Sequence, residues 1–303
     1  MSNISTPLVT VVIPTYNHAR YLGRALQSVI DQTYTNWEVV VIDNHSMDDT
    51  DEVITSYADP RINYLKIHNH GVIATSRNAG IRAAKGEWIA FLDSDDLWYQ
   101  EKLEIVINSI RDDFSIDVCS TNELQVDLTT GIKTPLNYGP YCSNFYQELL
   151  LNGNRLSPSA TLVKHEFLTK HSLLFRENNE FVTAEDYDFW MQLARAGAEF
   201  KFIKSIQGEY TIHATNASGQ NGRHRQNTIN VLHDHVYYLQ DFQQDKDQLW
   251  RHINAGLLIS SAKNMWVNRH YLSNAKCLVS AFRTSQAGTL RYIFSKLTKN
   301  LAR

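Results

Sequence analysis

The nine residues Trp88-Ile-Ala-Phe-Leu-Asp-Ser-Asp-Asp96 are the most informative stretch of this 303-residue chain. Five apolar residues in a row, Trp88 to Leu92, are typical of a strand that is buried on both faces. The run then ends at three carboxylates, Asp93, Asp95 and Asp96. Because ligands of open α/β sheets bind just outside the carboxyl ends of the strands, this strand end is a candidate binding site.

The three acidic side chains have two interpretations. Carboxylates repel one another and resist desolvation, so a divalent cation would make their crowding favourable. Mg²⁺ and Mn²⁺ are commonly held by one or two carboxylates, with the remaining positions on phosphate oxygens. The alternative is a solvated turn in which an Asp caps the helix expected to begin near Tyr99. The spacing of the carboxylates alone leaves both interpretations open.

Three further predicted strands precede this one and place it in a sheet. They cover residues 8–13, 37–42 and 62–67, so the four strand starts recur every 25 to 29 residues. That is the period of βα units in a parallel sheet. Right-handed crossovers would bring the strand ends at Pro14, Asp43 and Asp93 to one rim. The fold class is therefore α/β, with a Rossmann-like, mostly parallel sheet flanked by helices.

Helices are predicted after each of the first three strands. Asn17 is a suitable N-cap for the first helix and Asp48 for the second, because both side chains accept hydrogen bonds from free backbone N–H groups. The third helix is expected over Ser76 to Lys85, closed by Gly86. Neither a G-x-G-x-x-G nor a P-loop sequence follows any predicted strand, so a nucleotide would be held in another way.

A second acidic cluster lies in the segment from Thr183 to Gly197, which is predicted to be a helix. Thr183 and Asp186 have the spacing of a capping box, although Glu or Gln is more usual at the second position. In that interpretation Glu185 and Asp186 only favour the positive end of a helix dipole. The alternative is that one of them is a general base. His213, which follows two predicted strands, gains a role only if it folds back near Asp95.

The composition excludes several classes of protein. The chain is 43% hydrophobic and 20% charged, as folded soluble proteins are, and its net charge of −3 gives no global bias toward nucleic acid. The three cysteines, Cys119, Cys142 and Cys277, are scattered and lack a C-x-x-C pair, which fits a reducing cytoplasm better than a disulfide framework or a zinc site. We expect neither a signal peptide nor a membrane-spanning segment.

The C-terminal part is predicted to be helical from about Arg223 onward, which suggests a boundary between residues 1–215 and 216–303. Its last stretch has apolar residues such as Leu290 and Leu297 on one face and basic residues such as Lys296 and Arg303 on the other. A basic amphipathic helix of this kind either lies on anionic lipid or packs on the core with its charged face in solvent. A peripheral contact with the inner face of the cell membrane therefore remains one of two alternatives.

Taken together, five short motifs resemble those of the family 2 glycosyltransferases, which have the nucleotide-sugar-binding fold called GT-A. The motifs are Val11-Val-Ile-Pro-Thr-Tyr-Asn17, Val41-Ile-Asp-Asn-His-Ser-Met-Asp-Asp-Thr50, Ser76-Arg-Asn-Ala-Gly80, Gly86-Glu-Trp-Ile-Ala-Phe-Leu-Asp-Ser-Asp-Asp-Leu-Trp98 and Glu185-Asp186. Each is weak alone, but their order and spacing are specific. The resemblance covers roughly residues 7–213 and implies a GT-A domain with a C-terminal helical extension.

The resemblance also implies roles for individual residues. Asp186 would be the catalytic base, Asp95 a ligand of Mn²⁺ or Mg²⁺, and His213 a residue near the metal or the diphosphate. The nucleotide-sugar would be bound by Pro14, Thr15, Tyr16, Asn17, Asp43, Arg77, Asp93, Ser94 and Glu185. Asn44 departs from the family pattern, because an acidic residue is common there. With the resemblance, the metal and general-base interpretations become the favoured ones.

The implied reaction is transfer of a sugar, with inversion, from a nucleoside-diphosphate sugar to an acceptor hydroxyl. UDP is the expected nucleotide, and the expected acceptor is a carbohydrate or a lipid-linked glycan in cell-surface polysaccharide synthesis. No nucleic acid partner is expected, and the expected location is cytoplasmic. A nucleotide-sugar-binding module without turnover and a nucleotidyltransferase remain as alternatives. The first has no need of a base, and the second usually has a Gly-rich basic loop after the first strand, which this chain lacks.

Overall fold

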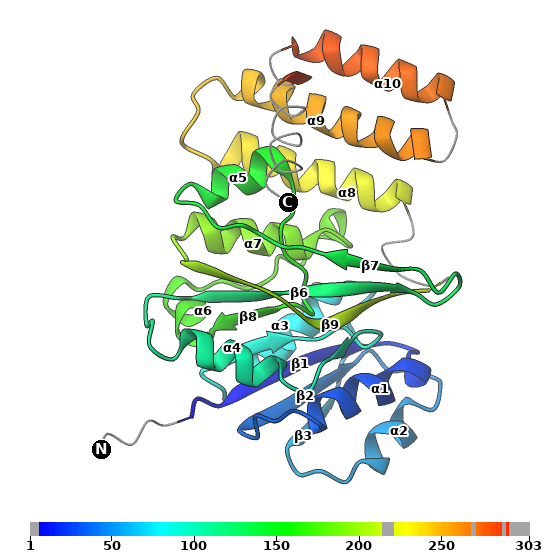
Figure 1. Ribbon diagram of the computed structural model, residues 1–303, viewed down its shortest axis with the longest axis vertical. Coiled ribbons are helices and arrows are strands. Elements are labelled where there is room, and N and C mark those ends of the chain that lie inside the picture. Colours follow the sequence, from blue (N-terminus) through cyan, green and yellow to red (C-terminus); the bar gives the residue numbers. More distant parts are fainter. Residues whose placement is uncertain (1–5, 214–220, 268–270, 287–288, 291–303) are drawn as a thin grey trace. The chain divides into compact units, whose positions relative to one another are not determined.

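The computed structural model describes residues 6–213, 221–267, 271–286 and 289–290, and within them the first of two compact units contains one large mixed sheet (Figure 1). The sheet has nine strands in the order β3-β2-β1-β4-β8-β6-β9-β5, with β7 paired to β6. The strands are β1 (Val9–Thr15), β2 (Trp37–Asp43), β3 (Ile62–Lys66), β4 (Trp88–Phe91), β5 (Leu97–Trp98), β6 (Val118–Asp127), β7 (Lys133–Leu136), β8 (Thr161–Lys164) and β9 (Phe200–Ile212).

The helices belong to both compact units of the chain. They are α1 (Ala19–Ile30), α2 (Thr50–Ser56), α3 (Ile73–Ala83), α4 (Lys102–Ile110), α5 (Phe145–Asn152), α6 (His165–His171), α7 (Glu185–Arg195), α8 (Asn221–Asp234), α9 (Lys246–Val267) and α10 (Tyr271–Thr284), with short helical turns η1 (Asn179–Phe181) and η3 (His235–Leu239). The predicted helices at 76–85 and near Tyr99 are therefore found a few residues away from their expected starts.

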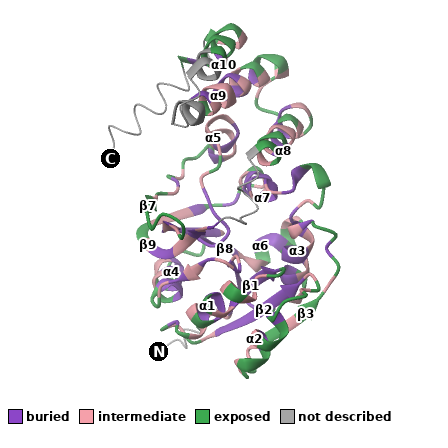
Figure 2. Cartoon of the chain, turned by 90° about the vertical axis from the view of Figure 1, so that its right-hand side faces the viewer, coloured by how far each residue is buried: buried purple, intermediate pink, exposed green. Residues whose placement is uncertain are grey.

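The strands β1, β2 and β4 form the buried centre of the parallel half, as their apolar sequences predict (Figure 2). Successive side chains of a strand point to opposite faces. Val9, Val11 and Ile13 accordingly belong to the core cluster that also contains the apolar residues of α1 and α4. Val12 lies on the other face, where α3 approaches so closely that a Cβ on Gly80 would meet Val12 Cγ1 at 2.3 Å.

The two halves of the sheet differ in strand direction. β3, β2, β1 and β4 run parallel, as the recurrence of βα units predicts. Beyond β4 the pairing becomes mixed, since β8 is antiparallel to both β4 and β6, whereas β9 is parallel to β6. The two strands predicted at 200–206 and 209–212 form the single strand β9, which has register shifts against β6. The α/β fold class is confirmed, with a sheet that is mixed rather than largely parallel.

The predicted caps of the first two helices were wrong in an informative way. Asn17 has a left-handed backbone (φ 51°) and precedes α1, and it accepts a hydrogen bond from Met47 N–H through its side chain. Asp48 is not the N-cap of α2, which is Asp49, but its Oδ1 accepts a hydrogen bond from the Thr50 hydroxyl at the start of α2. Its Oδ2 accepts a hydrogen bond from Ala19 N–H at 2.9 Å, at the start of α1. The bonds of Asn17 and Asp48 to Met47 N–H and Ala19 N–H tie the turn after β1 to the turn after β2.

The chain divides into two compact units. The first contains Met1–Tyr141 and Arg155–Thr228, and the second contains Cys142–Asn154 and Ile229–Arg303. The helical C-terminal extension is present, whereas a domain boundary at residue 215 stays a prediction. The amphipathic stretch predicted at the C-terminus falls mostly on residues 291–303, which lie outside the described residues. Within the described ranges, every helix is too short or too polar to cross a bilayer.

Candidate active site

A cavity of about 500 Å³ opens in the first unit at the carboxyl ends of β1 and β4. The residues that line it and were predicted as site residues are Pro14, Thr15, Tyr16, Arg77, Asp93, Ser94, Asp95, Glu185 and Asp186. They come from four separate parts of the sequence. The structure therefore brings together most of the residues that the sequence motifs singled out, and it does so where the strand topology predicts a ligand.

Asp43, Asn17 and His213 are not among the lining residues. Asp43 is fully buried, and its carboxylate accepts hydrogen bonds from the Ser46 backbone N–H, the Ser46 hydroxyl and the Tyr64 hydroxyl. Asp43 thus shapes the turn after β2, and Asn17 pins that turn to the one after β1. Their predicted contact with the nucleotide stays a prediction, and their observed contacts support the loop that forms the cavity wall.

Asn44, which departs from the family pattern, does line the cavity. Its Oδ1 accepts a hydrogen bond from Asn69 N–H at 2.8 Å, and Asn69 Nδ2 donates to Ser76 Oγ at 2.8 Å. This chain of amides joins the ends of β2 and β3 to the first turn of α3. The amide at position 44 therefore has a structural use that needs no negative charge.

Arg77 is a buried cation that holds two of the site carboxylates. Its Nη1 donates to Glu185 Oε1 at 2.7 Å, and its Nη2 donates to Asp93 Oδ1 at 2.8 Å. Burial alone would lower the pKa of Arg77, but the charges of Asp93 and Glu185 hold it above its ordinary value. Arg77 consequently fixes the spacing between the strand β4 end and the start of α7, besides lining the cavity.

Four buried polar atoms of cavity-lining residues have no hydrogen-bond partner within the described part of the chain. They are Thr15 Oγ1, Arg77 Nε, Ser157 Oγ and Glu185 Oε2. Buried polar atoms are nearly always satisfied in folded proteins, so several unsatisfied ones around a single cavity indicate a polar ligand. A nucleoside-diphosphate sugar has the hydroxyl and phosphate groups to satisfy them.

Asp186 lies in the first turn of α7 and lines the cavity. Burial, followed by the charge of Glu185, raises the pKa of Asp186 to about 7, although Arg77 acts in the opposite direction. A carboxylate with a pKa near the working pH is suited to act as a general base. The capping-box alternative was wrong, because α7 begins at Glu185 with Ala184 as its N-cap, one residue too late for Thr183 to cap it.

The three carboxylates after β4 have three different surroundings. Asp93 pairs with Arg77, and Asp95 Oδ2 lies 3.0 Å from His213 Nε2. Asp96 is buried away from the cavity, where it accepts hydrogen bonds from Ser159 Oγ and from Thr211 N–H. Burial and then the charge of Asp95 raise the pKa of Asp96 well above its usual range. Only the first two carboxylates are therefore available to a ligand in the cavity.

Asp95 and His213 fit a divalent cation as a pair of adjacent ligands. Burial, and next the charge of Asp93, raise the pKa of the Asp95 carboxyl, so both factors disfavour its charged form. A cation at this place would favour that form. Among the described residues no group of three or more His, Cys, Asp or Glu side chains is arranged to hold a metal. Two side chains with phosphate oxygens completing the shell would match the preference of Mg²⁺ or Mn²⁺.

Two aromatic residues that the sequence analysis overlooked position this pair. The Tyr21 ring stacks on His213 with a centroid distance of 4.5 Å and an interplanar angle of 14°. His18 Nδ1 lies 2.9 Å from Ser94 Oγ, and its ring is 5.8 Å from that of His213. Both residues belong to the start of α1, directly after the Pro14-Thr-Tyr-Asn motif, so proximity to that motif was the available clue.

Another part of the cavity lining comes from the segment between β7 and β8, in which the sequence analysis predicted no site residue. Tyr138 lines the cavity, and its hydroxyl donates to Glu123 Oε2 at 2.7 Å. Its backbone N–H donates to Asn122 Oδ1 at 3.0 Å. Glu123 and Lys102 are both fully buried behind this wall, and burial lowers the pKa of Lys102 to about 8. Two hydrogen bonds to residues of β6 thus fix the position of Tyr138 in the cavity lining.

The family model for "Glycosyl transferase family 2" matches residues 10–172, more than half of the chain. Chondroitin synthase of Escherichia coli is 29% identical over 216 residues, which cover 70% of this chain and 30% of that protein. The chain thus spans less than a third of that relative. The UDP-Glc:alpha-D-GlcNAc-diphosphoundecaprenol beta-1,3-glucosyltransferase WfgD of Escherichia coli is 28% identical over 188 residues, covering 62% of this chain and 70% of that protein.

Solved structures with the same fold include two nucleotide-sugar complexes. S. aureus TarS 1-349 in complex with UDP-GlcNAc has a TM-score of 0.65 and 20% identity, covering 90% of this chain and 79% of that chain. The mannosyltransferase PcManGT from Pyrobaculum calidifontis, in complex with GDP-Man and Mn²⁺, has a TM-score of 0.62 and 18% identity, covering 98% and 81%. These likenesses establish the GT-A fold of the chain, which agrees with the strand order and the position of the cavity.

Proposed function

The chain belongs to glycosyl transferase family 2, and from this premise we propose that it transfers a sugar, with inversion, from a nucleoside-diphosphate sugar to an acceptor hydroxyl. The observation that carries the proposal is one cavity that gathers Asp93, Asp95 and Asp186 beside unsatisfied polar atoms. A binding module has no need for a carboxylate with a pKa near 7 in its ligand cavity. Turnover is therefore the better explanation of the arrangement.

Asp186 is the group that takes the proton of the acceptor hydroxyl in this proposal. The anomeric carbon gains oxocarbenium character as the bond to the diphosphate breaks, as in glycoside hydrolysis. The acceptor oxygen attacks from the face opposite the leaving group, which inverts the configuration. Removing its proton during attack makes the oxygen a better nucleophile, and a positioned base contributes about 10²- to 10⁴-fold. Arg77 keeps Glu185 and Asp93 in place on either side.

Asp95 and His213 would hold Mn²⁺ or Mg²⁺. The bound ion would neutralise the charge that develops on the departing diphosphate. The Mn²⁺ bound in PcManGT supports this part of the proposal. Thr15 and Tyr16 would contact the nucleoside, since they follow the first strand at the rim of the sheet. The wall containing Tyr138 would face the sugars rather than the nucleotide.

The donor and acceptor follow from the relatives rather than from the cavity alone. UDP-sugars are bound by TarS and used by WfgD, so we propose a UDP-sugar as the donor. WfgD acts on a diphosphoundecaprenol-linked glycan, and chondroitin synthase is a polysaccharide-forming relative. We therefore propose that the acceptor is a carbohydrate or a lipid-linked glycan in cell-surface polysaccharide synthesis. We further propose that the reaction takes place in the cytoplasm or at the inner face of the membrane.

Product analysis with a panel of UDP- and GDP-sugars and Mn²⁺ tests the proposed reaction. We expect free nucleoside diphosphate in the presence of a glycan acceptor. Pyrophosphate in its place would identify a nucleotidyltransferase, and tight donor binding without any product would identify a binding module. Either result would contradict the proposal.

The Asp186→Asn variant tests the assignment of the base. Its transfer rate should fall by about 10²-fold or more, since the amide cannot accept the proton, while donor affinity stays within a few-fold of the wild type. Glu52→Gln, at an exposed position on α2, is the matched control and should retain full activity. Substantial turnover by Asp186→Asn would remove Asp186 from the mechanism.

A further inference from the structure

Charge is segregated along this chain to a degree that the net charge of −3 hides. After Asp247 the remaining 56 residues contain nine Lys and Arg residues and not one Asp or Glu. The first 247 residues consequently have 20 basic against 32 acidic residues, a formal charge of −12. Charge asymmetry of this size within one chain predicts that the basic part meets an anionic partner.

The helix α10, in the second unit, has large apolar side chains on its solvent side. Leu278, Val279 and Phe282 are 44%, 51% and 48% exposed, whereas Ala281 is fully buried. The solvent side of a helix in a globular protein is ordinarily polar. Exposed apolar residues that cluster on one element mark an interaction surface.

Two exposed cations, Lys276 and Arg283, lie on the same helix as these apolar residues. Positions three and four apart are neighbours on a helix surface, so Val279 lies beside both Phe282 and Arg283. We call Lys276, Leu278, Val279, Phe282 and Arg283 together the α10 face. Apolar side chains flanked by Lys and Arg are the combination that binds an anionic lipid interface, because the chains enter the acyl boundary while the cations meet the headgroups.

We propose that the α10 face docks on an anionic lipid surface. A second copy docked through the same face is a poor occupant, because the cations Lys276 and Arg283 of one copy would lie against those of the other. Residues 291–303 of the same chain are a poor occupant for the same reason, since they add four Lys and Arg residues and no acidic residue. Phospholipid headgroups supply the opposite charge and the apolar layer in one partner.

Vesicle flotation with the full-length protein tests the proposal. The wild type should bind vesicles of phosphatidylcholine mixed with phosphatidylglycerol, should bind pure phosphatidylcholine far more weakly, and should lose affinity as salt is raised. Lys276→Gln combined with Arg283→Gln should weaken binding roughly fivefold for each charge removed. Val279→Ser combined with Phe282→Ser should reduce binding at least as much, without loss of folding, because both side chains are half exposed.

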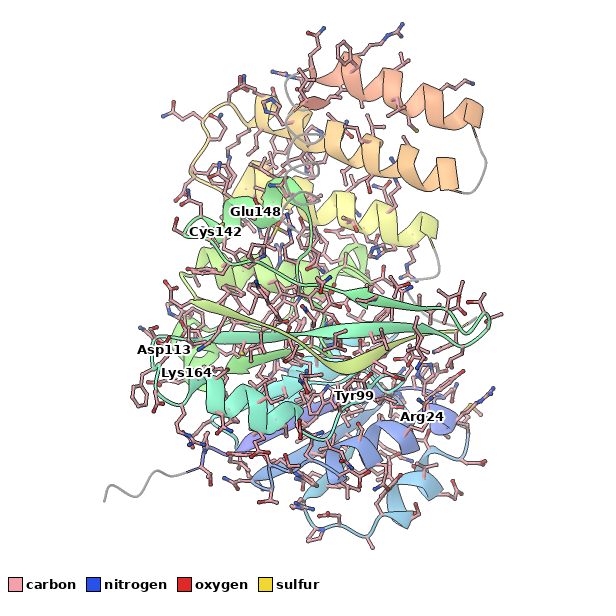
Figure 3. The ribbon with its side chains drawn as sticks, in the orientation of Figure 1. Arg24, Tyr99, Asp113, Cys142, Glu148 and Lys164 are labelled. Atoms are coloured by element: carbon pink, nitrogen blue, oxygen red, sulfur yellow. The ribbon has the colours of Figure 1, made fainter. Side chains whose placement is uncertain are left out.

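Matched substitutions outside the C-terminal unit serve as controls. Phe114→Ser removes an aromatic ring that is 84% exposed, and Arg24→Gln removes an exposed cation on α1 (Figure 3). Both should leave vesicle binding unchanged. Equal binding to neutral and anionic vesicles, or full binding by the α10 double variants, would overturn the proposal. So would a wild-type dimer that the Val279→Ser, Phe282→Ser variant converts to a monomer without any change in vesicle binding.

Discussion

The raised pKa of Asp186 gives the proposed reaction a specific pH dependence. A general base works only when deprotonated, so the rate of transfer should fall up to tenfold per pH unit below about 7 and level off above it. Measurement of kcat with saturating donor and acceptor between pH 5 and 9 gives this profile. A rate that stays flat from pH 5 to pH 7 would show that no base with a pKa near 7 titrates in the enzyme–substrate complex, which would contradict the role of Asp186.

The raised pKa of Asp186 also predicts an effect on the stability of the folded protein. This effect can be measured without measuring the rate of transfer. An Asp has a pKa near 3.9 in an unfolded chain, so raising it to about 7 in the folded protein makes the wild type lose stability as pH rises between these values. Asp186→Asn cannot ionise and should gain stability relative to the wild type over that window, by a few kcal/mol at most. Urea unfolding at pH 4.5 and pH 8 should show a larger difference at pH 8.

The hydroxyl of Tyr138 is predicted to support the cavity wall through Glu123. Tyr138→Phe keeps the ring but removes the hydrogen bond to Glu123 Oε2, whose side chain is fully buried. Loss of a partner for a buried acceptor costs about 1–3 kcal/mol, and we expect that loss in the free energy of unfolding. Tyr16→Phe, at a half-exposed tyrosine lining the cavity, is the comparison. An unchanged unfolding free energy in Tyr138→Phe would mean that Glu123 is satisfied without Tyr138.

At the scale of elements, the contact between α3 and β1 depends on Gly80. An added Cβ would meet Val12 Cγ1 at 2.3 Å and Ile42 Cδ1 at 2.9 Å, so Gly80→Ala should destabilise the protein by about 1–3 kcal/mol through overpacking. Because α3 also positions Arg77, the variant should lose transfer activity as well. Gly23→Ala in α1 is the matched control, since its Cβ would meet only atoms 3.6 Å away and it should be neutral or slightly stabilising. Equal effects of the two substitutions on thermal unfolding would contradict this account.

The elements that the sequence predicts well are those whose evidence is local. β4 is a continuous apolar run and β1 and β2 are largely apolar, and their starts are found within one residue of the expected positions. The mixed half was not predictable in this way, because β8 pairs with both β4 and β6 through contacts that no periodicity records. The caps failed for the same reason, since the Asp48 side chain bonds to a helix 29 positions away in sequence.

The site shows the same division between local and long-range information. The motifs predicted nine of the residues that line the cavity, because each motif lies at a strand end or a helix start. Asp95 and His213 are 118 positions apart in the sequence. The sequence analysis could therefore say only that His213 would have a role if it lay near Asp95. The sequence analysis predicted no role for Tyr138. This residue follows β7, and the side chains that hold it, Asn122 and Glu123, belong to β6.

At the scale of the whole molecule, donor binding should stabilise the two compact units unequally. The cavity and all of its lining residues belong to the first unit. A ligand that binds only the folded state at a hundred times its Kd stabilises it by about 2.7 kcal/mol. With UDP-sugar and Mn²⁺ we therefore expect slower amide hydrogen exchange near residues 13–18, 93–96 and 183–187, and little change in α9 and α10.

In Asp95→Ala, protection by the nucleotide should no longer depend on Mn²⁺. Equal protection in both units, or a Mn²⁺ effect that survives in Asp95→Ala, would show that the nucleotide and metal bind elsewhere.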